Sequence, residues 1–241
     1  MIHRTFLVAA IAAAAVVAAP SAAPASAEAA LCQGEEATIV GAPGVDTLRG
    51  TSGRDVIVTN SAFEVQAGDG DDLICVTGDE AGNIHAGRGA DEVHVEITGE
   101  FVWTELGAGP DMFYGGTGWD TVWAGDHRDE PDEARDAERD VIFSGRGPDR
   151  VIVGEPGAPF LDQVDTGPGG DWLTVMATIG DGTGMVDAGP GGDHVDFEWP
   201  DAVGGDWMFD NGAQVLTRDG TAQFGWAGVE GFDFRSSGRT R

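Results

Sequence analysis

The chain contains 241 residues, of which 42 are acidic and 13 are basic, so its formal net charge at pH 7 is −29. Hydrophobic residues make up 41% of the chain and glycine occurs 39 times, which leaves enough apolar material for a folded core. Such an acidic chain excludes a nucleic-acid binder that works by charge, because phosphate contacts require basic side chains, and it disfavours docking on anionic lipid. We therefore expect cations as partners, no nucleic acid and no membrane insertion.

Residues 1–27 have the features of a secretory signal peptide. His3 and Arg4 form a short basic start, the run from Phe6 to Ala19 is apolar throughout, and Ala25-Ser26-Ala27 provides the small residues of a cleavage site. The apolar run is shorter than the roughly 20 residues of a membrane-spanning helix, so a retained anchor is the less favoured alternative. We expect a secreted, extracellular protein whose mature chain starts near Glu28.

Cys32 and Cys75 are the two cysteines of the chain. An oxidising compartment outside the cell favours a disulfide between them, and two buried free thiols are the alternative. The bond would close a loop of about 44 residues and stabilise the fold by about 4 kcal/mol in the chain-entropy model. It would tie the N-terminal segment, residues 28–40, onto the body of the fold.

The pattern Gly-x-Gly-x-Asp-x-apolar then recurs along the chain. Seven intact copies begin at Gly68, Gly87, Gly107, Gly116, Gly145, Gly167 and Gly189. Two looser copies, Gly41-Ala-Pro-Gly44-Val-Asp46-Thr-Leu48 and Gly50-Thr-Ser-Gly53-Arg-Asp55-Val-Ile57, precede them. This number far exceeds the roughly one copy that composition alone predicts. The repeat aspartates, which are the candidate metal ligands, are Asp46, Asp55, Asp72, Asp91, Asp111, Asp120, Asp149, Asp171 and Asp193.

These residues resemble the nonapeptide Gly-Gly-x-Gly-x-Asp-x-U-x of the RTX, or hemolysin-type calcium-binding, repeat family. The resemblance covers about residues 41 to 196, and we assign residues 41–200 to the repeat domain. It implies an all-β fold, a right-handed parallel β-roll (a β-solenoid), that binds Ca²⁺ in its turns. Membrane-lytic activity, which some relatives have, is not carried over, because the N-terminal signal and the basic C-terminus depart from their pattern.

The chemistry of glycine and aspartate also favours Ca²⁺ as the bound ion. Glycine permits positive φ and a close approach of backbone carbonyls, while aspartate supplies a hard carboxylate oxygen. Coils stacked about 4.8 Å apart allow two carboxylates to share one ion at calcium–oxygen distances of about 2.3–2.6 Å. Magnesium requires shorter, near-octahedral bonds and fits less well. The alternative is a metal-free solenoid in which the aspartates only complete tight turns.

The spacing of the aspartates predicts which edge of the solenoid each one occupies. Steps of 17, 19 and 20 residues place Asp55, Asp72, Asp91 and Asp111 on one edge. A step of 9 moves Asp120 to the other edge, where steps of 22 stack Asp149, Asp171 and Asp193, and Asp140 resembles a turn remnant back on the first edge.

Weaker half-repeats between these turns keep legible strands at residues 63–65, 83–85, 101–103, 163–165 and 185–187. We expect one inward apolar residue after each intact turn, which would give a thin core. These residues are Ile74, Val93, Phe113, Val122, Val151, Leu173 and Val195.

Two segments depart from the repeat. Residues 124–140 form a highly charged insertion, expected to be a solvated loop or a short surface helix after Pro131, with an accessory cation or partner site as the alternative. Residues 201–241 lose the repeat, and the runs 214–217 and 221–226 flank Arg218-Asp219-Gly220, which predicts a β-hairpin. The hairpin would cap the open end of the solenoid, with a frayed tail at residues 235–241.

The chain has no Gly-x-Ser-x-Gly, no His-Glu-x-x-His and no phosphate loop, so we expect no enzymatic activity. The favoured function is that of a secreted calcium-binding protein in which calcium is structural and induces folding. Its biological role would be adhesion or a matrix interaction with an extracellular or cell-surface partner. The alternatives are a metal-free solenoid that mediates interactions and a polysaccharide-acting enzyme on a solenoid scaffold.

Overall fold

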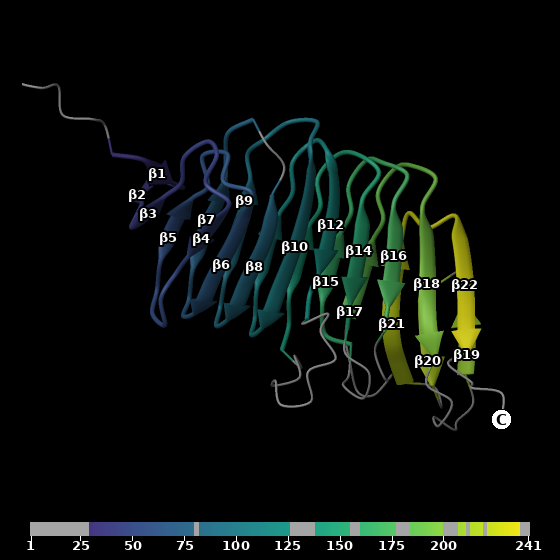
Figure 1. Ribbon diagram of the computed structural model, residues 1–241. Helices are drawn as coiled ribbons and strands as arrows, with labels where there is room; N and C mark the ends of the chain where they lie inside the picture. Colours follow the sequence, from purple (N-terminus) through teal and green to yellow (C-terminus); the bar gives the residue numbers. More distant parts are fainter. Residues whose placement is uncertain are drawn as a thin grey trace, which may run out of the picture.

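The computed structural model describes residues 29–79, 82–125, 138–154, 160–176, 184–199, 207–210, 213–218 and 221–236. Over these ranges the chain forms a parallel β-solenoid built from two facing sheets, which confirms the predicted fold class (Figure 1). The described ranges contain no helix that is long and apolar enough to cross a membrane. The predicted signal peptide, most of the charged insertion (residues 126–137) and the end of the tail (237–241) lie outside the described residues.

Sheet I contains nine strands, all paired in parallel. In chain order they are β4 (Thr47–Arg49), β6 (Glu64–Asp69), β8 (Asn83–Arg88), β10 (Phe101–Ala108), β12 (Trp119–Trp123), β14 (Arg150–Val153), β16 (Trp172–Val175), β18 (His194–Trp199) and β22 (Gly231–Ser236).

Sheet II contains eleven strands and is parallel except at its C-terminal end. Its strands are β3 (Ile39–Val40), β5 (Val56–Val58), β7 (Leu73–Val76), β9 (Glu92–Val95), β11 (Met112–Tyr114), β13 (Val141–Phe143), β15 (Gln163–Asp165), β17 (Gly184–Asp187), β19 (Trp207–Asp210), β20 (Val215–Arg218) and β21 (Thr221–Ala227).

From β3 to β18 the chain alternates between the sheets, so each strand pairs with the strand one coil earlier. The first edge of the solenoid is where sheet I leads into sheet II, as from β6 to β7, and the second edge is where sheet II returns to sheet I. Short turns occupy the first edge at the N-terminal end (Figure 1), and more residues separate the strands towards the C-terminus, as between β12 and β13. The coil length accordingly rises from 17 residues after Asp55 to 29 after Asp111, and it is 22 after Asp140.

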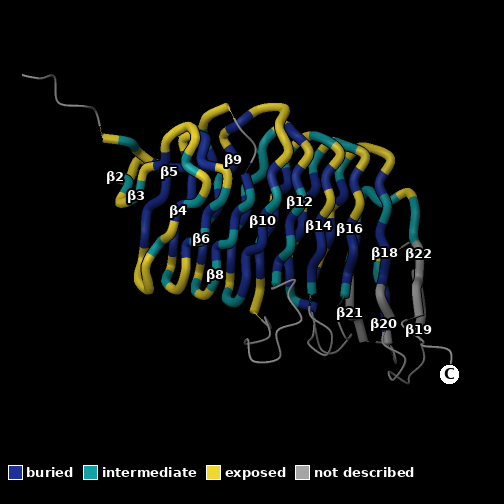
Figure 2. The backbone as a smooth tube through the Cα atoms, viewed as in Figure 1, coloured by how far each residue is buried: buried dark blue, intermediate teal, exposed yellow. Residues whose placement is uncertain are grey.

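The core lies between the sheets, and along strands such as β6 and β9 buried residues alternate with more exposed ones (Figure 2). All seven predicted core residues, from Ile74 to Val195, are at most 2% exposed. The core is thicker than the sequence suggested, because the weaker half-repeats contribute equally buried side chains. These additional residues are Ile57, Val65, Ile84, Val102, Leu106, Ile142, Val164 and Val186.

The N-terminal segment is bonded to the body as predicted. Strand β1 (Leu31–Cys32) pairs antiparallel with β2 (Glu35–Glu36), and Cys32 forms a disulfide with Cys75 of β7. Both cysteines are fully buried in a small apolar cluster with Val56, Val58 and Leu73 on the outer side of sheet II. The segment therefore covers apolar residues that would otherwise face solvent.

The C-terminal segment contains the predicted hairpin and also a further coil that the sequence did not reveal. β20 pairs antiparallel with β21, whereas β21 pairs in parallel with β17 and β22 pairs in parallel with β18. β19 then extends the antiparallel part beside β20. The C-terminal segment thus adds one parallel strand to each sheet, and its antiparallel strands β20 and β19 then form the end of sheet II.

Glycine recurs at the turns because successive coils touch backbone to backbone there. A Cβ atom on Gly107 would lie 1.9 Å from the carbonyl oxygen of Gly87, and one on Gly109 would lie 1.7 Å from that of Gly89. Both glycines also have positive φ, 103° and 136°. The Gly-x-Gly part of the repeat is therefore explained by stacking alone, whatever the turns bind.

Two neighbouring glycines provide a test of this stacking. A Cβ on Gly191 would lie 1.7 Å from the carbonyl oxygen of Gly169, whereas a Cβ on Gly192 meets nothing within 4 Å. We expect Gly191→Ala to lower the free energy of unfolding by at least about 2 kcal/mol, since overpacking against backbone has no easy relief. Gly192→Ala should stay within about 0.5 kcal/mol of the parent. Urea denaturation followed by circular dichroism measures both, and equal effects would contradict the stacking.

Candidate functional site

Two columns of carboxylates run along the solenoid, one at each edge. The first-edge column precedes strands of sheet II and contains Asp55, Asp72, Asp91, Asp111, Asp140 and Asp162. The second-edge column belongs to sheet I and contains Asp120, Asp149, Asp171, Asp193 and Glu230. The aspartates of both columns are at most 5% exposed.

Each column is held by one repeated hydrogen bond. The backbone N–H of an aspartate donates to a carboxylate oxygen of the aspartate one coil later, as from Asp72 to Asp91 at 2.8 Å and from Asp91 to Asp111 at 2.8 Å. The same bond joins Asp149 to Asp171 at 2.9 Å, and the N–H of Asp193 donates to Glu230 at 3.0 Å. A carboxylate thus binds the backbone of the neighbouring coil at a position where a strand begins.

The columns match the edges that the sequence spacing predicted. Asp55, Asp72, Asp91 and Asp111 share the first edge, Asp140 continues that column, and Asp120 begins the second. Asp46 is different, because it is exposed. In the next three coils of sheet I, the positions equivalent to Asp46 are occupied by Phe63, Gly82 and Val102. Asp46 therefore stacks on no other repeat aspartate.

Sequence reasoning missed two members of the columns. Asp162 accepts the N–H of Asp140 at 3.1 Å, although no Gly-x-Gly precedes it. Its position 22 residues after Asp140 was the available signal, since this is the local coil length. Glu230 follows Asp193 by 37 residues, and the hairpin between them hides the period.

The second oxygen of most column aspartates is buried without a hydrogen-bond partner. This holds for one carboxylate oxygen each of Asp72, Asp91, Asp120, Asp149, Asp171 and Asp193. The hydroxyls of Ser144 and Thr166 donate to backbone carbonyls, and each lies close enough to the carboxyl group of Asp149 or Asp171 to lower its pKa against the larger effect of burial. By contrast, both oxygens of Asp55 accept hydrogen bonds, from Thr38 and Thr51, and both oxygens of Asp162 are also bonded.

Burial raises the pKa of these carboxyl groups, because the charged form loses its hydration. It raises the pKa of Asp91 to about 7, opposed by the N–H of Asp72 and reinforced by the charge of Asp72. Burial also raises the pKa of Asp120 to about 7 and that of Asp171 to about 6. The carboxyl pKa values of Asp72 and Asp193 are raised for the same reason.

The donor atoms at these turns fit calcium. Unpartnered buried carboxylate oxygens lie one coil apart, and the glycine carbonyls stack in the same turns. Among the described residues no three His, Cys, Asp or Glu side chains converge on one point. A cation would therefore be held by two aspartates from successive coils together with backbone carbonyls. Calcium accepts such mixed oxygen shells, whereas zinc prefers nitrogen and sulfur.

A search of protein-family models, curated proteins and solved structures finds no match to this chain. The likeness to the RTX repeat therefore depends on the motif residues and on the solenoid geometry alone.

The raised pKa values predict how the stability of the calcium-free protein depends on pH. A carboxyl such as that of Asp91 binds its proton up to about pH 7 when folded, but only up to about 3.8 when unfolded. Its contribution to stability is therefore fully present below about pH 4 and is lost as the pH rises to about 7. We expect the midpoint of thermal unfolding in chelator to fall over this interval.

The matched variant is Asp91→Asn, whose amide oxygen still accepts the N–H of Asp72 but carries no charge. Its unfolding midpoint should fall less between pH 4 and pH 7 than that of the parent. A parent midpoint that rises over this interval would contradict the assignment of raised pKa values.

Proposed function

We propose that this protein is an exported calcium-binding β-solenoid of the RTX type, in which calcium is structural and completes folding. The observation that carries the proposal is a set of buried carboxylate oxygens without hydrogen-bond partners, one each on Asp72, Asp91, Asp120, Asp149, Asp171 and Asp193. Buried carboxylates without compensation destabilise a fold, and a divalent cation between two of them would remove that penalty. Calcium binding would therefore add its free energy to folding.

Three further features support an extracellular binding role. The disulfide between Cys32 and Cys75 suits an oxidising compartment. The N-terminal sequence, which has the features of a signal peptide, would direct the chain to such a compartment. Extracellular calcium modules bind at about 10⁻⁴–10⁻³ M, which would leave the chain loose during export and let it fold outside. We propose adhesion or matrix interaction, and not catalysis, as its biological role.

The second candidate is a metal-free solenoid that mediates interactions. It is favoured by the hydrogen bonds of the columns, because each aspartate already has a structural task in accepting the N–H of its neighbour. In that case the second oxygens would be neutralised by protons, in keeping with the raised pKa of Asp91. The two candidate functions differ in whether calcium or a proton neutralises the second carboxylate oxygens at neutral pH.

Calcium titration of the purified protein at pH 7.5 separates the two candidates. We expect heat of binding in calorimetry, together with a gain of β signal in circular dichroism over the millimolar range of calcium. Magnesium should have much less effect. A protein that is already folded in chelator and gives no heat with calcium would support the metal-free solenoid.

Asp91→Asn should weaken calcium binding, since Asp91 lies between Asp72 and Asp111 and would serve the sites shared with both. We expect at least about a tenfold loss of affinity at those sites, because one carboxylate in each shell loses its charge. Asp46→Asn is the control, since Asp46 is exposed and outside both columns. Equal losses in the two variants would argue against the columns as the binding sites.

A further inference from the structure

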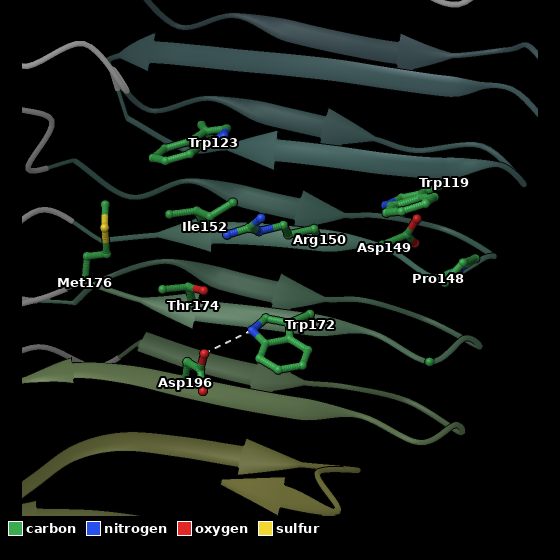
Figure 3. Close-up of a pocket in the computed structure, with 11 residues that line it drawn as sticks. Trp119, Trp123, Pro148, Asp149, Arg150, Ile152, Trp172, Thr174, Met176 and Asp196 are labelled. Carbon is green, nitrogen blue, oxygen red and sulfur yellow. Dashed lines mark hydrogen bonds between the residues drawn. The ribbon is translucent and has the colours of Figure 1, made fainter. Parts of the chain in front are cut away.

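The outward face of sheet I carries a groove with aromatic walls. The groove, about 490 Å³ in volume, runs over β14 and opens to solvent. Trp119 and Trp123 of β12 flank it on one side and Trp172 of β16 flanks it on the other, with Arg150 and Ile152 between them (Figure 3). Its volume lies in the range of binding pockets for small molecules, about 300–1,000 Å³.

The dimensions of the groove follow from its strands. β12 and β16 are both neighbours of β14, so the two walls stand about 10 Å apart. Trp119 and Trp123 are four residues apart on one strand, which separates them by about 13 Å. The groove is therefore wide enough for one flat ring and long enough for two or three rings in a row.

Trp172 is exposed but held in place. Its indole N–H donates to a carboxylate oxygen of Asp196 at 3.1 Å, and the ring of His194 lies 4.4 Å away, centroid to centroid. His194 in turn contacts the other oxygen of Asp196 at 3.0 Å. The ring nevertheless remains 43% exposed. An aromatic ring that is fixed by its edge and open on a face loses little entropy when a ligand stacks on it.

Trp119 extends the aromatic surface on the opposite wall. It is 57% exposed and makes an edge contact with Phe101, which is itself 43% exposed, at 6.2 Å between ring centroids. Single exposed aromatics are common on protein surfaces, whereas several together form an apolar patch of the kind that marks a binding site. Their position on adjacent strands of a flat sheet makes the surface an extended platform.

Charge restricts the class of ligand that fits. A polyanion is disfavoured by the net charge of −29. Arg150 offsets the charge of one of the two carboxylates that line the groove, Asp149 and Asp196, and its guanidinium between the tryptophans repels an ammonium ligand. What remains complementary is an uncharged ligand with C–H groups on its ring faces and hydroxyls at its edges. Tryptophan faces attract C–H groups, and Arg150, Thr174 and Asp196 offer donors and acceptors.

We infer that this groove binds a chain of an uncharged polysaccharide, whose sugar rings stack on Trp119, Trp123 and Trp172. Arg150 hydrogen-bonds to the sugar hydroxyls at the floor of the groove. The inference concerns the outer face of sheet I, and the groove meets the second-edge column only at its rim, where Asp149 lines it.

Calorimetry and tryptophan fluorescence with cellohexaose and chitohexaose test the inference, in calcium buffer and in chelator. We expect saturable binding of at least one of these uncharged oligosaccharides, with a shift in tryptophan emission. Trp172→Ala should weaken binding by at least about tenfold, because one stacking wall is lost. Trp172→Phe should retain part of the affinity, since a flat ring remains.

The control is Phe143→Ala, which removes a side chain that is 40% exposed on sheet II, away from the groove. It should bind oligosaccharide as the parent does. Circular dichroism checks that each variant is folded. The inference is overturned if the folded parent binds neither oligosaccharide, if it binds only polygalacturonate or choline, or if Trp172→Ala and Phe143→Ala behave alike. A parent that gives no calcium heat but binds oligosaccharide would refute the proposed calcium role and leave this inference standing.

Discussion

The hydrogen bond from the N–H of one column aspartate to the carboxylate of the next is the interaction on which the architecture depends. It fixes the start of each strand against the following coil, as between Asp72 and Asp91 at 2.8 Å. It also requires a carboxylate to be buried at every turn that belongs to a column. In Asp91, Asp149 and Asp171, for example, one oxygen accepts the backbone N–H while the other has no hydrogen-bond partner. The geometry that orders the coils thus creates the electrostatic problem that calcium, or a proton, would resolve.

Much of this arrangement could be predicted from the sequence, because each repeat of glycine and aspartate corresponds to one turn of the backbone. Spacing alone assigned Asp55 to Asp111 to one edge and Asp149 to Asp193 to the other, and the structure confirms both assignments. The prediction failed where the motif is lost but the coil persists. Asp162 has no Gly-x-Gly before it, so only the coil length identifies it. The thicker core was missed because the weaker half-repeats keep inward residues such as Ile84 without the turn motif.

Different kinds of side chain gather on different surfaces of the solenoid. The edges collect buried carboxylates, because both edges are where the chain turns and where aspartates can reach the next coil. The outer face of sheet I instead collects tryptophans, because strand side chains that point outward are free of the packing that fixes the core. The outer face of sheet II is partly covered by the N-terminal segment through Cys32 and Cys75. The candidate ion sites at the edges and the proposed groove on the face of sheet I are therefore adjacent, and Asp149 borders both.

The central claim is that successive column aspartates share calcium ions, and a crystal structure grown with calcium tests it most directly. Anomalous scattering locates calcium without assuming a coordination model. The account predicts peaks between Asp72 and Asp91 and between Asp149 and Asp171, with carboxylate oxygens about 2.3–2.6 Å from each ion. Crystals grown at millimolar calcium and neutral pH that show no peak along either column would contradict it.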